Sequence, residues 1–385
     1  MNVPKLRFKE FNDEYNNVKL KEVAEIYDGT HETPNYIEQG VKFVSVENIS
    51  NLLDTKKYIS ESDFDNYKVK PKYNDVFMTR IGNIGTSSIY KSDEKLAFYV
   101  SLALLRSKNS NILVPDYLNQ YIKNNSFQKE LHNKTIHVAF PQKINTGEIG
   151  ECKINFCSDK EQIKIANFLS LLDKKIELQT KKIEDLKLFK KGLNKFVFSS
   201  CTDEYKIENL IIEYSNKTTE NNQYEVLSST ANGITFQNEY FNKQAASNNN
   251  TGYKIIPKGF ITYRSMSDTG EFHFNIQDIT DIGIVSPAYP VFNIKKNLVN
   301  KTYFVYYINE NDGFKNEILS TKEGGTRYAL SITKFKTLNI LLPKIEEQIK
   351  YSKYINIIIN KIQLEEKKLE KLIQLKKGLM QNMFV

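Results

Sequence analysis

The feature that most constrains this chain is a long internal repeat. Residues 161–198 and 347–384 align without a gap and share 16 identities over 38 positions, including the sequences EQIK and KKGL. Fainter matches continue outside these segments, pairing 19–28 with 206–215 and VFMTR at 76–80 with FITYR at 260–264. The repeat period is nearly half of the chain, so the sequence predicts one architecture built twice, each copy consisting of a globular part and a repeated segment.

The repeated segments have the heptad pattern of a coiled coil. Apolar residues recur at alternating steps of three and four, which places them on one stripe of a helix. These a and d positions are Leu169, Leu172, Ile176, Ile183, Leu186 and Leu193 in the first segment, and Ile355, Ile358, Ile362, Leu369, Leu372 and Leu379 in the second. A helix of about 35 residues is about 50 Å long. The sequence therefore predicts two long, paired helices.

The apolar stripe is wider than a two-helix seam requires. Its additional flank consists of Phe168, Leu171, Leu178 and Phe189 in the first segment and of Tyr354, Ile357, Leu364 and Leu375 in the second. A broad stripe needs further partners. Two interpretations remain open: the flank packs onto the globular parts of this chain, or it docks helices of a partner protein.

The globular parts read as mixed α and β structure in which short strands dominate. Expected elements include strands at 75–80 and 98–104 and helices at 116–124 and 301–307. Strands and helices do not alternate regularly, which favours the α+β class. The expected division of the chain is a globular domain at 1–157, a helix at 158–199, a second globular domain at 200–343 and a second helix at 344–385.

Several function classes lack their sequence signatures. The chain has no Walker A loop, no H-E-x-x-H motif, no Asp/Asn-Pro-Pro-aromatic motif, and no metal-ligand spacing among its four histidines, so we expect no catalysis and no cofactor in this chain. It has no apolar run of about 18 residues and no secretory leader, so we expect no membrane span. Three cysteines without paired spacing fit a reduced cytoplasmic location.

The charge distribution permits a nucleic-acid partner without requiring one. The net charge is +8, and each repeated segment carries +4, so the globular parts together are neutral. Any contact of the globular parts with DNA must therefore come from local patches.

Arginines beside glycine-rich turns are the first candidates for such patches. Arg80 and Arg264 hold matching places in the aligned strands, and a guanidinium can read guanine or clamp a phosphate. The full set of candidate DNA contacts is Thr30, His31, Lys70, Lys72, Thr79, Arg80, Asn83, Lys134, His137, Arg264, Ser265, Lys322, Thr326 and Arg327. The alternative for each is an ordinary turn residue or a solvated lysine.

Taken together, the motifs resemble one protein family. DGTHETP at 28–34, DVFMTRIGNIG at 75–85, GGTRYALSITKFKTLNILLP at 324–343, and the two EQ-x-K helices that end in KKGL are similar to specificity subunits of type I restriction–modification systems. The resemblance covers the full length of the chain.

The resemblance implies two target-recognition domains, each reading one half of an asymmetric bipartite site in double-stranded DNA. It also implies that the two helices pair antiparallel with pseudo-two-fold symmetry, fix the gap between half-sites, and dock two methyltransferase subunits. Restriction subunits can join. S-adenosylmethionine, ATP and Mg²⁺ would then be bound and used by those partner subunits. The competing hypotheses are a coiled-coil scaffold that recognises proteins or RNA, and an enzyme with a diffuse nuclease motif.

Overall fold

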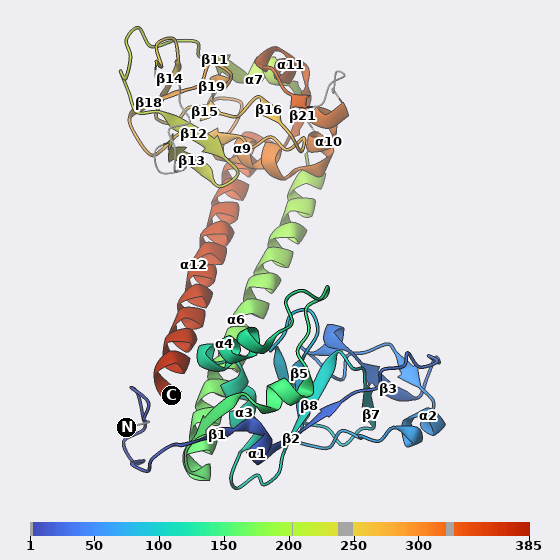
Figure 1. Cartoon of the computed structure of the whole chain (residues 1–385). Coiled ribbons are helices and arrows are strands. Elements are labelled where there is room, and N and C mark those ends of the chain that lie inside the picture. The colour runs from blue at the N-terminus through green and yellow to red at the C-terminus, as the bar shows by residue number, and fades with distance from the viewer. Residues whose placement is uncertain (1–2, 202, 238–248, 321–326) are drawn as a thin grey trace. The chain divides into compact units, whose positions relative to one another are not determined.

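The computed structural model describes residues 3–201, 203–237, 249–320 and 327–385 and divides into two compact units (Figure 1). The first unit comprises Met1–Lys181 and Lys367–Val385, and the second comprises Lys182–Glu366. The two long helices are α6 (Asp159–Ser199) and α12 (Ile345–Met383). Helix α6 therefore begins in the first unit and ends in the second, whereas α12 begins in the second unit and ends in the first.

The first unit is built on a four-stranded antiparallel sheet. Its order is β2 (Ala24–Asp28), β8 (Leu102–Ser107), β5 (Val76–Thr79) and β6 (Ser87–Ile89). A three-stranded sheet contains β4 (Tyr58–Ile59), β3 (Val41–Val44) and β7 (Leu96–Phe98), and β1 (Asn16–Lys19) pairs with β9 (Lys153–Phe156). The helical elements are α1 (Leu20–Val23), η1 (Val46–Asn48), α2 (Glu61–Asn66), α3 (Pro115–Ile122), α4 (Asn125–Lys134) and α5 (Thr146–Gly150).

Strand β5 is buried on both faces, which explains its uninterrupted apolar sequence. Val76 and Met78 join the cluster formed with α3 and α4, whereas Phe77 joins the opposite cluster with Val44 of β3. Successive side chains of a strand point to opposite faces, so one strand serves both clusters. The single strand expected at 98–104 is wrong, because a turn closed by the Leu102 amide and the Tyr99 carbonyl (2.9 Å) separates β7 from β8.

The second unit repeats this plan with shorter strands. Its four-stranded sheet has the order β11 (Ile211–Glu213), β19 (Val291–Ile294), β15 (Ile261–Thr262) and β17 (Asn275–Ile276). The two-stranded pairs are β10 (Asp203–Lys206) with β21 (Asn339–Leu342), β12 (Leu227–Thr230) with β13 (Gly233–Phe236), β14 (Lys254–Pro257) with β18 (Ile282–Val285), and β16 (Met266–Ser267) with β20 (Tyr328–Ala329). The helices are α7 (Ile207–Leu210), α9 (Lys301–Glu310), α10 (Asp312–Ser320) and α11 (Ile332–Thr337).

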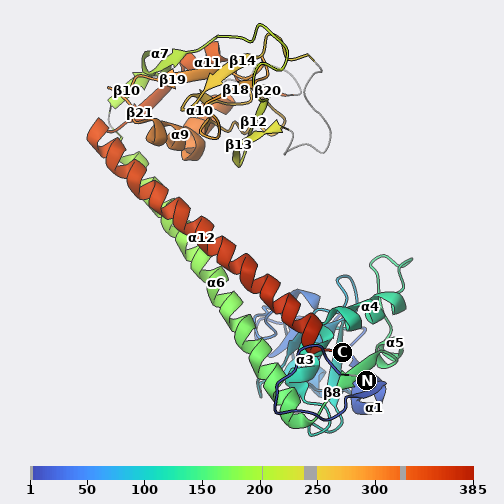
Figure 2. The same cartoon turned by 90° about the vertical axis from the view of Figure 1, so that its left-hand side faces the viewer.

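The long helices lie side by side and run antiparallel (Figures 1 and 2). In the first unit, Lys376 near the end of α12 forms an ion pair with Asp173 near the start of α6. In the second unit, Lys187 of α6 pairs with Glu366 of α12 at 2.6 Å. The a and d positions of both helices are buried or half-buried, so the paired-helix prediction and the α+β class are confirmed.

A buried glutamine ties the start of each long helix to its globular part. Gln162 accepts from the Val114 amide at 2.8 Å and donates to the Ile112 and Cys157 carbonyls at 2.8 Å each. Gln348 makes the same three kinds of bond, to Asn300, Leu298 and Pro343. Satisfying three backbone groups at once is why the EQ motif recurs at both helix starts.

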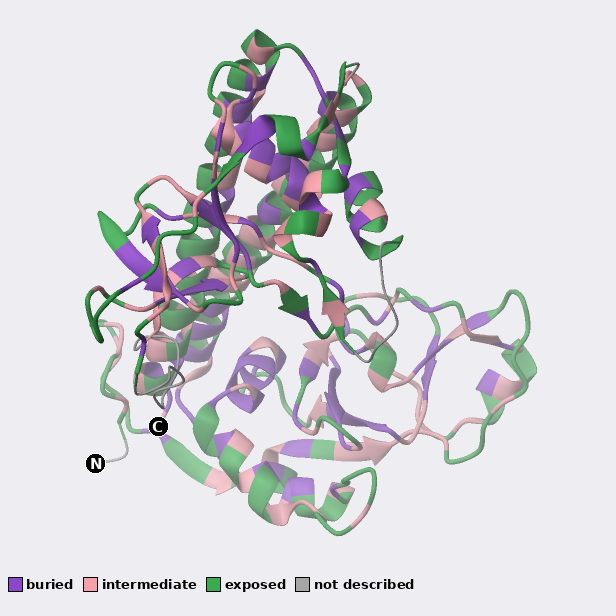
Figure 3. Ribbon diagram, turned by 90° about the horizontal axis from the view of Figure 1, so that it is seen from above, coloured by how far each residue is buried: buried purple, intermediate pink, exposed green. Residues whose placement is uncertain are grey.

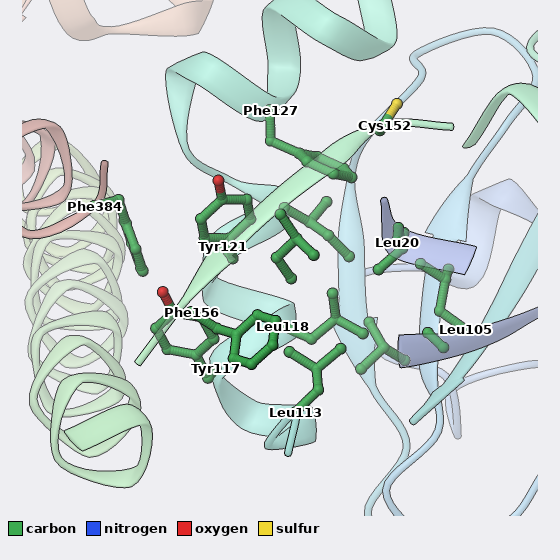
Figure 4. Close-up of a cluster of buried hydrophobic side chains, with 14 of the residues drawn as sticks. Leu20, Leu105, Leu113, Tyr117, Leu118, Tyr121, Phe127, Cys152, Phe156 and Phe384 are labelled. Carbon is green, nitrogen blue, oxygen red and sulfur yellow. The ribbon is translucent and has the colours of Figure 1, made fainter. Parts of the chain in front are cut away.

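The far end of each long helix completes an aromatic core. Phe384, the residue after the end of α12, packs among Tyr117 and Tyr121 of α3 (Figure 4), and Phe198 of α6 packs against Tyr307 of α9. Buried residues gather on the strands and helices, whereas most connecting loops are exposed or half-buried (Figure 3). Among the described residues, no helix is long and apolar enough to cross a membrane.

Candidate nucleic-acid interface

The glycine-rich turn after β5 is held by Thr79. This buried residue accepts from the Thr86 amide through its hydroxyl (3.0 Å), and its carbonyl accepts from the Gly85 amide (3.0 Å). Gly82 and Gly85 have φ of +79° and +90°, a conformation that L side chains rarely adopt. Asn83 is exposed at the tip of the turn. Thr79 therefore shapes the turn, and Asn83 is the side chain that the turn presents.

Arg80 points into the first unit, contrary to the expectation that it reads DNA. Its side chain is 8% exposed, and its guanidinium forms an ion pair with Asp28. Nε donates to the Ile144 carbonyl at 3.0 Å, and Nη1 approaches the Val100 carbonyl at 3.4 Å. The donors that could grip guanine are directed at protein acceptors, so Arg80 joins β2, the turn and the segment before α5.

The strand registers also correct the expected equivalence of Arg80 and Arg264. Leu105 of β8 pairs with Val76, and its counterpart Phe292 of β19 pairs with Ile261. Counting along the strands, Arg264 corresponds to Thr79. Ser265 corresponds to Arg80, and its carbonyl accepts from Leu330 as the Arg80 carbonyl accepts from Ile144. A shift of one residue reverses the side-chain direction in a strand, so the two arginines have different environments.

The turn after β2 lies against the end of β7. The Thr30 amide donates to the Phe98 carbonyl at 3.0 Å, and the Thr30 carbonyl accepts from Val100 at 2.9 Å. A Cβ on Gly29 would lie 2.4 Å from the Phe98 oxygen, so this close approach requires glycine. Thr30 is half-buried, whereas the His31 side chain is 72% exposed, 3.9 Å from the Asp28 carboxylate. His31 is therefore the accessible group of this turn.

Residues 136–143 form a hairpin beside the glycine-rich turn. The Ile136 amide donates to the Lys143 carbonyl, and the Gly82 amide donates to the Gln142 carbonyl, each at 2.8 Å. At the base, Lys134 lies 3.5 Å from Glu148. The His137 ring lies tilted by 55° against that of His132 with centroids 4.5 Å apart, and its Nε2 lies 2.9 Å from the His132 carbonyl. Lys134 therefore lies at the base of the hairpin and His137 within it, and both contact groups close to them in the sequence.

Lys70 and Lys72 belong to a separate basic pocket of about 430 Å³. Its lining is Tyr27, Tyr67, Lys68, Val69, Lys70, Lys72 and Arg106. Lys70 pairs with Asp65 at 3.1 Å, and Arg106 binds Asp75 through two nitrogens at 2.6 and 2.8 Å. Burial raises the pKa of the Tyr67 phenol, which keeps it a neutral donor. The pocket suits an anion, with its charge supplied mainly by lysines.

In the second unit, Arg264 is exposed and lines a polar cavity of about 290 Å³. The other lining residues are Ser228, Ser229, Thr230, Ala231, Met266, Ser267, Asp268, Thr269, Glu271, His273 and Tyr289. Burial raises the pKa of Tyr289, an effect that the Arg264 charge opposes. Ser265 is half-buried beside this cavity. Hydroxyls around one guanidinium can donate to and accept from base edges.

Arg327 is the remaining DNA-contact candidate among the described residues of the second unit. Its Nε lies 2.9 Å from Asp268, and its side chain is 59% exposed. Because Asp268 also lines the Arg264 cavity, Arg327 extends the same surface. Lys322 and Thr326 lie outside the described residues.

The structure thus gathers some candidates and separates others. Asn83 and His137 lie on two loops that are bonded to one another, and Arg80 connects these loops to the turn of His31. Sequence reasoning missed Asp28 as the partner of Arg80. It also missed Val138 and Phe140, whose side chains project from the hairpin tip (97% and 103% exposed). The available signal was an apolar V-A-F sequence within an otherwise polar loop.

The extra apolar flank of the long helices is largely exposed. Leu171 and Leu178 of α6 are 68% and 59% exposed, and their repeat equivalents Ile357 and Leu364 of α12 are 62% and 53% exposed. Phe189, Leu375 and Tyr354 are also exposed, whereas Phe168 packs edge-on against Phe8 with ring centroids 5.9 Å apart. Exposed apolar side chains at repeated positions are typical of an interaction surface.

Comparisons with known proteins agree with this architecture. The chain matches the type I restriction modification DNA specificity domain family over residues 12–188 and 204–374. It is 27% identical over 216 residues to a Methanocaldococcus jannaschii protein named as the specificity subunit of the type I restriction enzyme MjaX. That match spans 53% of this chain and 50% of the relative.

Two solved structures share the fold. The type I restriction–modification S subunit of M. genitalium is 15% identical, with a TM-score of 0.63, and the alignment covers 100% of this chain and 99% of that chain. A chain from a structure of type I restriction–modification complex assembly and conformational transition is 13% identical, with a TM-score of 0.53 and coverage of 96% and 97%. With both repeats matched by the family, the chain belongs to the type I restriction modification DNA specificity domain family.

Proposed function

We propose that this chain is the DNA-recognition subunit of a type I restriction–modification complex acting in the cytoplasm. Each globular part reads one half of an asymmetric bipartite site in double-stranded DNA. The paired helices set the gap and dock two methyltransferase subunits. S-adenosylmethionine, ATP and Mg²⁺ are bound and used by partner subunits, which can include restriction subunits. The observation that carries this proposal is the family match over both repeats.

The differences between the repeats support reading of two unlike half-sites. Arg80, which is buried, and Asp28, which is half-buried, form an ion pair in the first unit, whereas the corresponding residues of the second unit are Ser265 and Ser215. In the second unit an exposed arginine, Arg264, lies one position earlier, beside a cavity rich in hydroxyls. Different donors at corresponding places favour different bases.

The repeated exposed flank of the helices supports docking of two like partners. Leu171 and Ile357 occupy one repeat position, and Leu178 and Leu364 occupy another. The exposed fractions within each pair differ by only 6 percentage points (68 − 62 and 59 − 53). Their exposure speaks against packing onto the globular parts of the same chain. Two equivalent apolar surfaces suit two copies of one partner.

Salt-dependent binding tests DNA recognition directly. The chain, assembled with its methyltransferase partners, should bind duplex DNA with an affinity that falls by about 0.9 log units per neutralised phosphate for each log unit of salt. An equal length of double-stranded RNA should compete poorly, because A-form RNA has a deep, narrow major groove. Binding that depends little on salt, or that prefers RNA, would favour the scaffold hypothesis.

A further inference from the structure

The hairpin tip at 138–140 carries the two most exposed large apolar side chains in the described part of the molecule. Phe140 is 103% exposed and Val138 is 97% exposed. The next most exposed, Leu188, is 69% exposed. A fully hydrated phenyl ring is unfavourable by roughly 1.5–3 kcal/mol relative to a buried one. Covering the tip with an apolar partner would therefore be favourable in free energy.

The base of this hairpin is fixed, although the side chains of Val138 and Phe140 at its tip are exposed. The backbone bonds from Ile136 to Lys143 and from Gly82 to Gln142 close the hairpin and join it to the glycine-rich turn. Below them, the Ile144 amide donates to the Arg80 carbonyl, and Arg80 Nε donates back to the Ile144 carbonyl, each at 3.0 Å. A fixed base presents the tip in one direction. Arg80 is thus a positioning residue for the hairpin.

The charges around the tip favour a polyanion as the partner. Residues 131–147 and 79–91, which include the hairpin and the glycine-rich turn, contain no Asp or Glu; the carboxylate of Glu148, directly after residue 147, lies 3.5 Å from Lys134. They contain Lys134 and Lys143 together with His132 and His137. An apolar tip with lysines near its base matches the cross-section of duplex DNA, in which apolar base faces lie between two phosphate backbones.

We propose that Phe140, with Val138 beside it, inserts at a base-pair step of the half-site bound by the first unit and unstacks that step. This inference rests on the proposed function and adds an apolar wedge, formed by Phe140 and Val138, that enters the base stack. The side chains replace part of the lost base stacking with aromatic and apolar contact, while the neighbouring lysines hold the phosphates. Such a wedge selects steps that unstack easily, which adds specificity without hydrogen bonds to base edges.

The test uses the full chain assembled with its methyltransferase partners and a duplex carrying its methylation site. 2-Aminopurine, whose fluorescence rises on unstacking, replaces one base at a time through both half-sites. The variants are Phe140→Ala, the conservative Phe140→Trp, and the matched control Ile112→Ala, which truncates a 46% exposed side chain outside both loops of the same unit.

In the half-site bound by the first unit, we expect unstacking signals for the wild type, Phe140→Trp and Ile112→Ala. Phe140→Ala should lose one of these signals and bind about tenfold more weakly, since stacking of one base on an aromatic side chain is worth about that much. Signals in the other half-site should not change. Because Phe140 is fully exposed, the variant should melt at the wild-type temperature.

Two results would overturn the wedge. Phe140→Ala could keep the wild-type signals and affinity, in which case the tip does not enter DNA. Alternatively, Phe140→Ala could fail to assemble with the methyltransferases in size-exclusion chromatography, in which case the tip is a protein contact. If the wild-type complex shows no sequence-specific duplex binding at all, the proposed function itself fails, an outcome distinct from both.

Discussion

The ring of Phe384 packs edge-to-face against the ring of Tyr121, with centroids 5.4 Å apart. The same relationship joins Phe198 to Tyr307 at 5.0 Å. Tyr121 and Tyr307 are repeat equivalents, as are Phe384 and Phe198. Each long helix therefore closes the core of the unit that contains the other repeat. This exchange explains why both repeated segments end in phenylalanine.

Phe384→Ala should destabilise the first unit and spare the second. Phe384 is 4% exposed, and truncation of a buried phenylalanine costs about 3 kcal/mol. Hydrogen exchange should show faster exchange in α3 and β9 with unchanged rates in α9. Phe198→Ala is the matched control and should give the mirrored pattern. Equal loosening of both units by either change would contradict the exchange of helix ends.

The ion pair of Arg80 and Asp28 should behave as a coupled pair. Asp28→Ser leaves a buried guanidinium charge unpaired and should cost about 3 kcal/mol of folding free energy. The double variant Arg80→Ser/Asp28→Ser installs the residues found at the corresponding places of the second unit. The folding free energy that the double variant loses should be smaller than the sum of the losses in the two single variants by about 1 kcal/mol or more. Additive costs in denaturant melts would show that the two residues act independently.

Gln162→Ala should weaken the joint between α6 and the first globular part. The change removes one acceptor and two donors from a buried site, and each stranded backbone group costs roughly 1–3 kcal/mol. Denaturant melts should show a loss of at least about 2 kcal/mol. Gln348→Ala should cost a similar amount in the second unit. A loss below about 0.5 kcal/mol for both would show that the glutamines are dispensable.

The Asp173 carboxylate should contribute to stability only above acidic pH. Burial raises its pKa, but hydrogen bonds from Lys376 and Gln120 outweigh that effect and hold the pKa below its usual 3.8. The stabilisation is therefore present above the unfolded value and is lost as the pH falls through the folded value. Asp173→Asn should flatten the dependence of the melting temperature on pH below about 4. The carboxylate is 39% exposed, so solvent screening keeps the change modest. An unchanged slope would refute the role of the pair.

The repeated helices could be predicted in detail because their signals are local and periodic. Sixteen identities and a heptad pattern fix the helices, and the inward positions such as Leu169 and Ile355 are buried. The strand of Val76–Thr79 and the helix of α3 were also predictable from apolar runs and a proline at the helix start.

The environment of Arg80 could not be predicted, because it depends on a partner 52 residues away and on a register shift of one residue. Sequence alignment of VFMTR with FITYR placed two arginines together, whereas strand pairing places Arg264 with Thr79. The exposure of Phe140 was equally hidden, since an apolar residue in a loop is usually assumed to fold back onto the core. The backbone bonds fix the base of the hairpin, and the exposed fractions of Val138 and Phe140 show that its tip projects from the unit.

The central claim is that two unlike readers are separated by a helical spacer, and methylation mapping of DNA exposed to the assembled complex tests it most directly. The wild type should methylate two different half-sites separated by a gap of fixed length and free base composition. One heptad should then be inserted after Lys182 and one after Glu365, residues that pair at 3.0 Å, so that both helices lengthen together. Seven residues add about 10 Å, so the half-sites should stay the same and the gap should grow by about three base pairs. A single continuous site, or an unchanged gap in a folded and active variant, would contradict the account.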